Sequence, residues 1–386
     1  MNYKVEENQL VINLVGHVSS NNAQVIEEEI FNIINNNPHE FIVIDATGLE
    51  YISSAGLRII LKIRKLTENF KIINVCLDVY DVFEMTGFTD MMKIEKAYRV
   101  FSVEGLDIIG KGAKGSVYRY NDDTIIKVYN DSNALEAIQN ERESAKKAFV
   151  LGLPTAISYD IVKVGDKLGS VFELLDSKSL STLIASDCDN YKEYAKIFAR
   201  ILKEIHANVI NDESFPNVKR ITDKWINETK EYFDDNTYNK LKALYDNIQD
   251  KNNLLHMDFH TNNILMQKDE PLIIDMDTLS IGNPIFEFVN IYVAYVGFGY
   301  ISDEIVEKFM GFSYEIAQKF YEEVIKDYFG VADITDINNK LTLLGLLRVI
   351  RNIKKRFSSY EHDNVILNKC VNKIKELLTI VNDLNL

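Results

Sequence analysis

The chain has 386 residues, 46% of them hydrophobic, and is long enough for two or three domains with sizeable cores. Its formal net charge of −15 argues against a nucleic-acid-binding surface. No stretch approaches the roughly 18 uninterrupted apolar residues of a membrane span, and the N-terminus lacks the apolar run of a secretory signal. The three cysteines lie far apart without a C-x-x-C pair, which argues against a disulfide framework or a zinc site. We expect a cytoplasmic protein that binds neither nucleic acid nor a membrane.

The first hundred residues alternate between strand-like and helix-like patterns. Short segments alternate apolar and polar residues, as half-buried strands do, and longer segments carry apolar residues at helical spacing. The expected strands are residues 9–15, 41–45, 72–77 and 92–95, and the expected helices are residues 23–34, 55–66 and a short one from Val79. These elements predict a small α/β domain over residues 1–102.

Two serines stand at the start of the second expected helix. Residues 43–61 run from a strand through a loop to Ser53 and Ser54, whose hydroxyls can cap free backbone N–H groups. With Met85-Thr-Gly-Phe88 downstream, this arrangement resembles the STAS domain of anti-sigma-factor antagonists, which implies a mixed sheet with helices. In that family a serine two positions before a helix-opening Gly-Leu is phosphorylated by a partner kinase. The matching residue is Ser54, and the implied protein partner is of the anti-sigma type.

Two hypotheses for Ser54 remain open. Phosphorylated STAS domains typically carry Asp-Ser-Ser/Thr-Gly, whereas here Ser53 stands in place of the Asp and Ala55 in place of the second hydroxyl residue. A phosphate on Ser54 would lie at a helix N-terminus, which favours an anion, and would add about −1.5 to −2 charges. Alternatively, the serine pair only caps the helix of a STAS domain that binds its partner without phosphorylation.

A glycine-rich motif opens the next region, residues 103–176. The motif has the form G-x-G-x-x-G-x-V, and its residues are Gly110, Gly112, Gly115 and Val117. Glycines let backbone N–H groups approach the phosphates of ATP without side-chain clashes. A predicted hairpin, residues 117–129, follows the motif in place of the helix of a dinucleotide fold, which favours a kinase-type loop. Lys127, in the second strand of this hairpin, is expected to contact the α- and β-phosphates.

The helix-like residues 134–150 offer two partners for Lys127. We choose Glu141 over Glu143 because its offset from Gly152-Leu-Pro154 is the usual one in small-molecule kinases, although a solvent-facing charge pair remains an alternative for both.

Residues 169–175 are predicted to form the last strand of this region and the hinge that follows it. Phe172 is expected beside the adenine pocket, and the backbone from Glu173 to Leu175 is expected to hold the base.

The most informative stretch lies in the third region, residues 177–386. His256-Met-Asp-Phe-His-Thr-Asn-Asn263 is followed by Leu272-Ile-Ile-Asp-Met-Asp277, which is H-x-D-x-x-x-x-N and then an Asp that closes an apolar strand. This is the layout of kinase-type phosphoryl transfer, which needs a carboxylate to orient and deprotonate the attacking hydroxyl and oxygen ligands to hold Mg²⁺. Asp258 fits the first role, and Asn263 and Asp275 fit the second. The residues expected to support the site are His256, His260 and Asp277.

An isolated Asp or Asn is usually a turn former. We favour the catalytic interpretation because three residues match in type and spacing, and because the glycine-rich motif and Lys127 lie upstream in the right order.

Residues 104–300 resemble the aminoglycoside phosphotransferase and choline kinase group. The resemblance rests on the glycine-rich motif, Lys127, the His-x-Asp-x-His loop, Ile274-Asp-x-Asp277 and Gly282-Asn-Pro284. Protein kinases of the eukaryotic type carry H-R-D and D-F-G instead. One departure is Glu287, where members usually carry Asp. The resemblance implies a two-lobed protein-kinase-like fold, α/β and α+β in class, with a mainly helical large lobe.

Together these patterns predict a phosphotransferase that uses ATP and Mg²⁺ to phosphorylate a hydroxyl of a small molecule, with a STAS domain for regulation or partner binding. One alternative is a regulatory protein that senses nucleotide in an anti-sigma-factor-type pathway. Another is a protein kinase that acts on a STAS serine. Five aromatic residues between Phe309 and Tyr321 are interpreted either as core or as the lining of the acceptor pocket.

Overall fold

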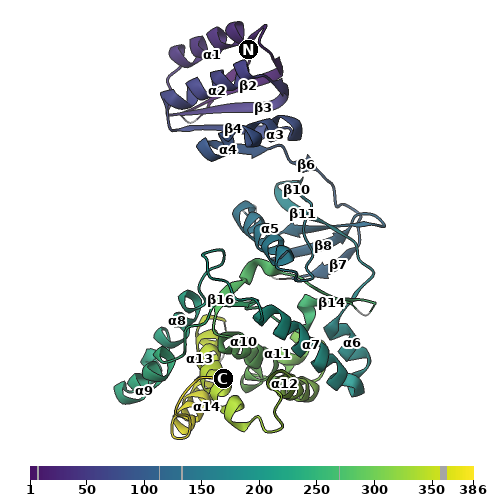
Figure 1. Cartoon of the computed structure of the whole chain (residues 1–386), viewed down its shortest axis with the longest axis vertical. Coiled ribbons are helices and arrows are strands. Elements are labelled where there is room, and N and C mark those ends of the chain that lie inside the picture. The colour runs from purple at the N-terminus through teal and green to yellow at the C-terminus, as the bar shows by residue number, and fades with distance from the viewer. Residues whose placement is uncertain (7, 113, 132–133, 269, 357–362) are drawn as a thin grey trace. The chain divides into compact units, whose positions relative to one another are not determined.

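The computed structural model describes residues 1–6, 8–112, 114–131, 134–268, 270–356 and 363–386 (Figure 1). Ala113, inside the glycine-rich motif, lies outside these residues. The chain divides into two compact units, residues 1–104 with 161–169, and residues 105–160 with 170–386. In the described part of the chain, every helix is too short or too polar to traverse a bilayer.

The first unit contains a five-stranded mixed sheet with helices between its strands. The order is β1 (Tyr3–Glu6), β2 (Gln9–Val18), β3 (Phe41–Ile52), β4 (Phe70–Val75) and β5 (Lys93–Lys96), with β1 antiparallel to β2 and all other neighbours parallel. The helices are α1 (Ala23–Asn36), α2 (Ser54–Leu66), α3 (Leu77–Met85) and α4 (Phe88–Met91). Inward-facing residues such as Leu10, Ile44 and Ile72 are fully buried and form the core of the sheet. The short strand β6 (Arg99–Val100) pairs in parallel with β10 (Asp160–Val164).

Strand β3 is longer than the sequence pattern predicted. We expected it to end at Asp45, but it continues to Ile52 alongside β2, with two irregularities in the register. Val15 lies opposite Gly48, and a Cβ atom at Gly48 would stand only 2.8 Å from Val15 Cγ1. The missing side chain therefore lets the two strands stay paired, a tertiary effect that alternation along a single strand does not reveal.

The second unit begins with antiparallel strands. They are β7 (Ile108–Lys111), β8 (Gly115–Arg119) and β9 (Thr124–Tyr129), accompanied by helix α5 (Leu135–Val150) and by β11 (Lys167–Glu173), which passes from the first unit into the second. The hairpin predicted after the glycine-rich motif is present as β8 and β9. At Gly115 a Cβ atom would lie 2.2 Å from the Val128 carbonyl oxygen, so only glycine fits at this position.

The rest of the second unit is mainly helical. Its helices are α6 (Leu180–Ser186), α7 (Tyr191–His206), α8 (Lys219–Asn227), α9 (Asp235–Asp246), α10 (Ile285–Tyr295), α11 (Asp303–Met310), α12 (Tyr314–Phe329), α13 (Thr335–Arg356) and α14 (Asp363–Leu377). Short 3₁₀ turns are η1 (Cys188–Asn190), η2 (Lys230–Tyr232), η3 (Thr261–Asn263), η4 (Met276–Thr278) and η5 (Gly297–Tyr300). The strands are β12 (Lys178–Ser179), β14 (Ile264–Gln267) and β15 (Glu270–Ile273) in one antiparallel sheet, and β13 (Asn253–Leu255) paired with β16 (Ser280–Gly282).

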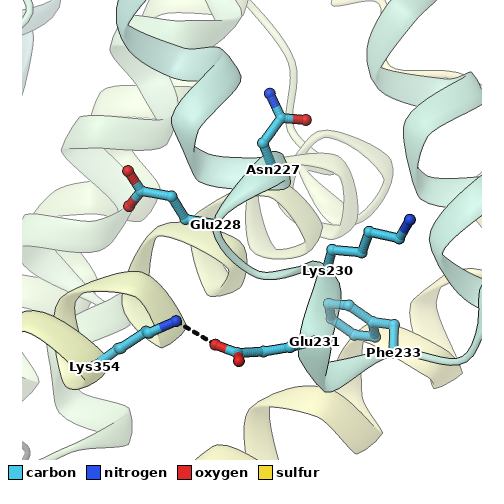
Figure 2. Close-up of a pocket in the computed structure, with 6 residues that line it drawn as sticks. All are labelled: Asn227, Glu228, Lys230, Glu231, Phe233 and Lys354. Carbon is cyan, nitrogen blue, oxygen red and sulfur yellow. Dashed lines mark hydrogen bonds and ion pairs between the residues drawn. The ribbon is translucent and has the colours of Figure 1, made fainter.

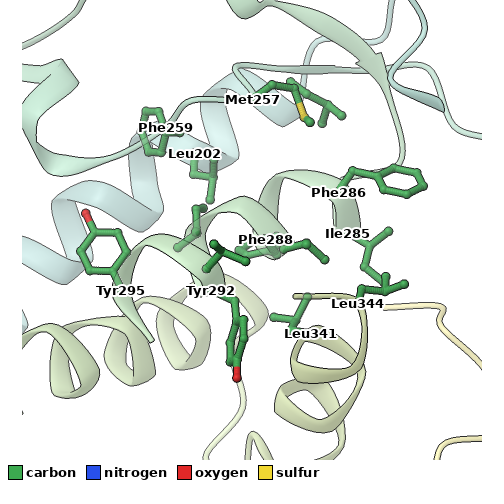
Figure 3. Packing of buried hydrophobic residues seen from close by; sticks show 14 of the residues in the cluster. Leu202, Met257, Phe259, Ile285, Phe286, Phe288, Tyr292, Tyr295, Leu341 and Leu344 are labelled. Carbon is green, nitrogen blue, oxygen red and sulfur yellow. The ribbon is translucent and has the colours of Figure 1, made fainter. Parts of the chain in front are cut away.

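Helix α10 lies at the centre of the helical core. Figure 3 shows its residues Ile285, Phe288 and Tyr292 among side chains from α7 and α13. Almost every residue of α10 is buried, including the polar Glu287 and Asn290. Buried polar side chains need hydrogen-bond partners, and these two find them in the loop that follows β13.

The aromatic residues between Phe309 and Tyr321 divide into two groups. Phe320 and Tyr321 are buried in the core, as the first of our two interpretations holds. Phe309, in contrast, is 42% exposed at the end of α11 and lies edge-on to His260, with their ring centroids 4.9 Å apart.

Candidate active site

The loop between β13 and η3 carries Asp258, and side chains of α10 hold its backbone through hydrogen bonds. The Glu287 carboxylate accepts hydrogen bonds from the backbone N–H groups of Met257 at 2.6 Å and His256 at 2.7 Å. Asn290 donates to the Met257 carbonyl at 2.6 Å. Met257 has a φ of 65°, in the left-handed region that non-glycine residues rarely adopt. These three hydrogen bonds explain how the backbone is kept in that conformation immediately before Asp258.

Asp258 is a half-exposed carboxylate, with 52% of its side chain accessible. His260 Nε2 lies 3.8 Å from its Oδ1 atom, which is longer than a hydrogen bond, so the effect of His260 is electrostatic. Burial raises the pKa of the Asp258 carboxyl, but His260, His256 and Arg348 lower it, and the net shift is below the usual value. The group is therefore a hydrogen-bond acceptor at neutral pH.

His256 links this loop to the strand that follows. Its Nδ1 atom accepts from the Asp258 N–H at 3.3 Å, so its Nε2 atom carries the proton and donates to the Ile274 carbonyl at 3.2 Å. Thr278 donates to the His256 carbonyl at 2.6 Å. His256 thus acts as a scaffold between the segments that carry Asp258 and Asp275.

Asn263 and Asp275 lie on the two sides of the β14–β15 hairpin. Asn263 donates its amide nitrogen to the Asp258 carbonyl at 3.0 Å, which leaves its Oδ1 atom available as an acceptor. Its own carbonyl accepts from the Ile274 N–H at 3.0 Å, so Asn263 is tied to the residue before Asp275. Asp275 has a φ of 59°, a second left-handed residue in the site.

Asp275 and Glu141 share the ammonium group of Lys127. Lys127 Nζ lies 2.6 Å from Asp275 Oδ1 and 2.8 Å from Glu141 Oε1. Burial lowers the pKa of Lys127, but the two carboxylates raise it above its usual value. Burial likewise raises the pKa of Asp275, while Lys127 and then Lys114 lower it, and the net shift is downward. Lys127 and Asp275 are therefore both charged at neutral pH.

Glu141 and Glu143 have different partners, although both lie on α5. The second carboxylate oxygen of Glu141 accepts from the Tyr129 hydroxyl at 3.1 Å, which fixes the side chain beside Lys127. Glu143 instead pairs with Lys146 on the exposed surface, at 2.9 Å.

The glycine-rich motif forms the turn between β7 and β8. Gly112 donates its N–H to the Gly115 carbonyl at 2.9 Å, and Val117 pairs with Lys127 across β8 and β9. A Cβ atom at Gly112 would meet no other atom within 4 Å. Lys114, within the same turn, forms an ion pair with Asp277. This turn therefore contacts the Asp-x-Asp segment through Lys114.

The predicted hinge follows β11. Phe172 is half-buried near its end, and Glu173 is exposed. The Leu174 N–H is already bound to the Asp123 carbonyl at 2.8 Å. The Leu174 N–H is therefore occupied, so a base would be contacted through other peptide groups of the hinge, such as those of Glu173 and Leu175.

The oxygen atoms of Asn263 and Asp275 suit a hard divalent cation. Carboxylate and carboxamide oxygens are preferred Mg²⁺ ligands, and Mg²⁺ in phosphoryl-transfer sites is usually held by one or two protein groups together with phosphate oxygens and water. The described residues contain no cluster of three or more His, Cys, Asp or Glu side chains that could hold a metal by themselves. The donor set thus fits Mg²⁺ bound together with phosphates.

A comparison with protein families gives two adjoining matches. Residues 106–310 match the phosphotransferase enzyme family, and residues 1–100 match the STAS domain. The chain belongs to the phosphotransferase enzyme family. The aminoglycoside phosphotransferase resemblance and the STAS resemblance inferred from the sequence are both confirmed, and the N-terminal mixed sheet followed by the kinase-like fold agrees with them.

Individual proteins are similar to this phosphotransferase over different shares of its chain. The "Putative anti-sigma factor antagonist BtrV" of Bordetella bronchiseptica is 30% identical over 92 residues, which are 23% of this chain and 78% of BtrV. Aminoglycoside phosphotransferase APH(2'')-Ib bound to ADP is 14% identical, with a TM-score of 0.49 over 77% of this chain and 98% of its own. A choline/ethanolamine kinase family protein from Mesorhizobium loti is 12% identical, with a TM-score of 0.43 over 72% of this chain and 92% of its own.

In the STAS domain of the phosphotransferase, the two serines have different surroundings. Ser53 is the N-cap of α2 and accepts from the Gly56 N–H at 3.4 Å. Ser54 is the first residue of the helix and is exposed, and Arg58 donates to its carbonyl at 3.2 Å. The capping role therefore falls to Ser53, and the Ser54 hydroxyl faces solvent.

A surface pocket of the phosphotransferase lies apart from these residues. It measures about 520 Å³ and is lined by Asn227, Glu228, Lys230, Glu231, Phe233 and Lys354. Figure 2 shows the ion pair between Lys354 and Glu231 at one side of it. None of the predicted site residues lines this pocket.

Sequence motifs did not identify two contacts of the site. Glu287 was seen only as a departure from the family pattern at a structural position, and Lys114 occupies a variable position of the glycine-rich motif. Their partners lie 30 and 163 residues away along the chain. No local spacing signals such contacts.

Proposed function

We propose that the protein transfers the γ-phosphoryl group of ATP to a hydroxyl group of a small molecule. The observation that carries this proposal is the convergence of three charged groups, Lys127, Asp258 and Asp275, from segments far apart in the sequence. Lys127 contacts Asp275 directly, and Asp258 is joined to the residue before Asp275 through Asn263. Groups whose pKa values are shifted both by burial and by specific charge partners, as those of Lys127 and Asp275 are, cluster at functional sites.

Each group has a role in this reaction. Lys127, oriented by Glu141, and the turn of Gly110, Gly112 and Gly115 bind the phosphates, while Phe172 and the backbone of Glu173 and Leu175 hold the base. Asn263 and Asp275 would hold Mg²⁺, which supplies charge neutralisation at the phosphates.

Asp258 orients the acceptor hydroxyl and takes its proton. As the hydroxyl oxygen bonds to the γ-phosphorus, the bond from that phosphorus to the β–γ bridging oxygen breaks, and ADP leaves. His256 and His260 position the loop that carries Asp258, and Phe309 offers an exposed aromatic face beside His260 for the acceptor.

The STAS domain is proposed to bind a protein partner of the anti-sigma type, with Ser54 as a phosphorylation site. Support comes from the similarity to BtrV and from the exposed Ser54 hydroxyl at a helix start.

The test is a transfer assay with Mg-ATP against amino sugars, amino alcohols and the serines of the chain itself. We expect label on one class of small molecule, and Asp258→Asn should lower that transfer by roughly 10²–10⁴-fold, the range for a general acid–base group. Wild-type transfer by Asp258→Asn would overturn the mechanism. Label only on serines of the chain would support the protein-kinase alternative instead.

A further inference from the structure

Lys114 is placed over the candidate phosphate site by both its backbone and its side chain. Its carbonyl accepts from the Asn130 N–H at 2.9 Å, which fixes the turn against the end of β9. Its ammonium group pairs with Asp277, two residues after Asp275. The turn η4 thus carries one carboxylate bound by Lys127 at its start and another bound by Lys114.

The two lysines differ in how firmly they are held. Only 14% of the Lys127 side chain is exposed and it contacts two carboxylates, whereas 52% of the Lys114 side chain is exposed and it contacts one. Exposed ion pairs contribute little and exchange partners readily. A triphosphate carries several negative charges, so it can compete for Lys114 against the single charge of Asp277.

We propose that Lys114 is a second phosphate-binding lysine, which leaves Asp277 to contact the terminal phosphate of a nucleoside triphosphate. The inference rests on the proposed function, because it assumes that nucleotide phosphates lie beneath the glycine-rich turn. A nucleoside diphosphate lacks the terminal group, so Lys114 stays with Asp277 when ADP is bound. Lys114 therefore distinguishes ATP from ADP, and Asp277 holds it in place when the terminal phosphate is absent.

The experiment is calorimetric titration of the chain of 386 residues with ADP and with the non-hydrolysable analogue AMP-PNP, both at fixed Mg²⁺. Lys114→Met should weaken AMP-PNP binding by roughly 10- to 100-fold, the loss expected for one charge-assisted hydrogen bond, and ADP binding by less than about threefold. Lys111→Met is the matched control, since it removes the same charge from an exposed side chain in the same motif. It should leave the ratio of the two affinities unchanged.

The double variant Lys114→Met/Asp277→Asn tests how Asp277 weakens AMP-PNP binding. Asp277 either competes with the terminal phosphate for Lys114 or repels the phosphates directly through its own negative charge. If Asp277 competes through Lys114, Asp277→Asn strengthens AMP-PNP binding by roughly two- to fivefold in the wild-type background and has no effect beside Lys114→Met. An Asp277→Asn effect of equal size in both backgrounds would contradict the exchange. If Lys114→Met lowers the affinities for ADP and AMP-PNP equally, the inference is overturned while the proposed function stays intact. Failure of the wild-type protein to bind either nucleotide would overturn both.

Discussion

Glu287 fixes the left-handed backbone of Met257. Its buried carboxylate accepts from the N–H groups of Met257 and His256, and it also lies 3.2 Å from His206 Nε2. His206 is bound in turn to the Tyr328 hydroxyl at 2.8 Å. The orientation of Asp258 therefore depends on a buried polar network that joins α7, α10 and α12.

Replacing Glu287 tests this network. Glu287→Gln keeps the shape of the side chain but places an amide donor against one of the two backbone donors, so the free energy of unfolding should fall by about 1–3 kcal/mol. Glu287→Asp, the residue usual in the family, is one methylene shorter and should also be destabilising. Urea unfolding measures both changes. The exposed Glu322→Gln on α12 is the control and should stay within about 0.5 kcal/mol of wild type; an equally small change in Glu287→Gln would contradict the network.

Lys127 and its two neighbouring glutamates give a second test. Lys127→Ala should weaken Mg-ATP binding by roughly 10- to 100-fold, because a buried ammonium group is lost from the phosphate site. Glu141→Gln should weaken it less, since Lys127 keeps Asp275. Glu143→Gln, on the same helix but paired with Lys146, should leave Mg-ATP binding unchanged. Calorimetry provides all three values, and unchanged binding in Lys127→Ala would exclude the assigned role.

Asp275 and Asp258 should respond differently to Mg²⁺. Asp275→Asn removes a charged metal ligand, so it should raise the Mg²⁺ concentration needed for half-maximal transfer as well as slow the reaction. Asp258→Asn should slow transfer without changing that concentration. Mg²⁺ titrations of transfer rate distinguish the two variants. A raised Mg²⁺ requirement in both would mean that Asp258 also binds the metal.

The lowered pKa of Asp258 predicts the pH dependence of transfer. Because the carboxyl stays ionised below its usual pKa, transfer should show no loss due to Asp258 between about pH 5 and pH 8. The same ionised group stabilises the fold at pH values above its unfolded pKa, and this contribution is lost as the pH falls through the folded pKa. In His260→Gln the acid limb of kcat/KM should move to higher pH. Burial raises the pKa of Asp258, and without His260 this effect is opposed less. An unmoved limb would show that His260 does not tune Asp258.

The roles of Ser53 and Ser54 can be distinguished by measuring protein stability and by mass spectrometry. Ser53→Ala removes the N-cap of α2 and should cost about 1 kcal/mol of stability. Ser54→Asp, at an exposed position, should leave stability nearly unchanged while altering binding to a protein partner. Phosphopeptide analysis of protein from cells should find phosphate on Ser54, and phosphate there in protein incubated with ATP alone would show that the chain modifies itself. No phosphate in either sample would favour the STAS domain that binds without modification.

The sequence alone identified the residues that lie within short motifs. Asp258 and Asn263 belong to one loop, and Asp275 and Asp277 to one turn, so their spacing is readable from the chain. Strands β2 to β5 and helices α1 to α3 of the first unit were likewise predicted from apolar periodicity, whereas β1, α4, β6 and β10 were not. The longer β3 was not, because the space at Gly48 that keeps it paired depends on Val15 of the neighbouring strand.

Only the tertiary structure decided which charged groups meet. The sequence favoured Glu141 over Glu143 only through its offset from Gly152-Leu-Pro154. In the structure the two glutamates, two residues apart on α5, point in different directions, and Glu141 is the one that reaches Lys127. Lys114 with Asp277, and Glu287 with Met257, are contacts between distant segments. The sequence determined which chemical groups the candidate site contains, because these residues lie at short, fixed spacings within motifs. Their partners depend on how separate helices and strands pack, which no local pattern records.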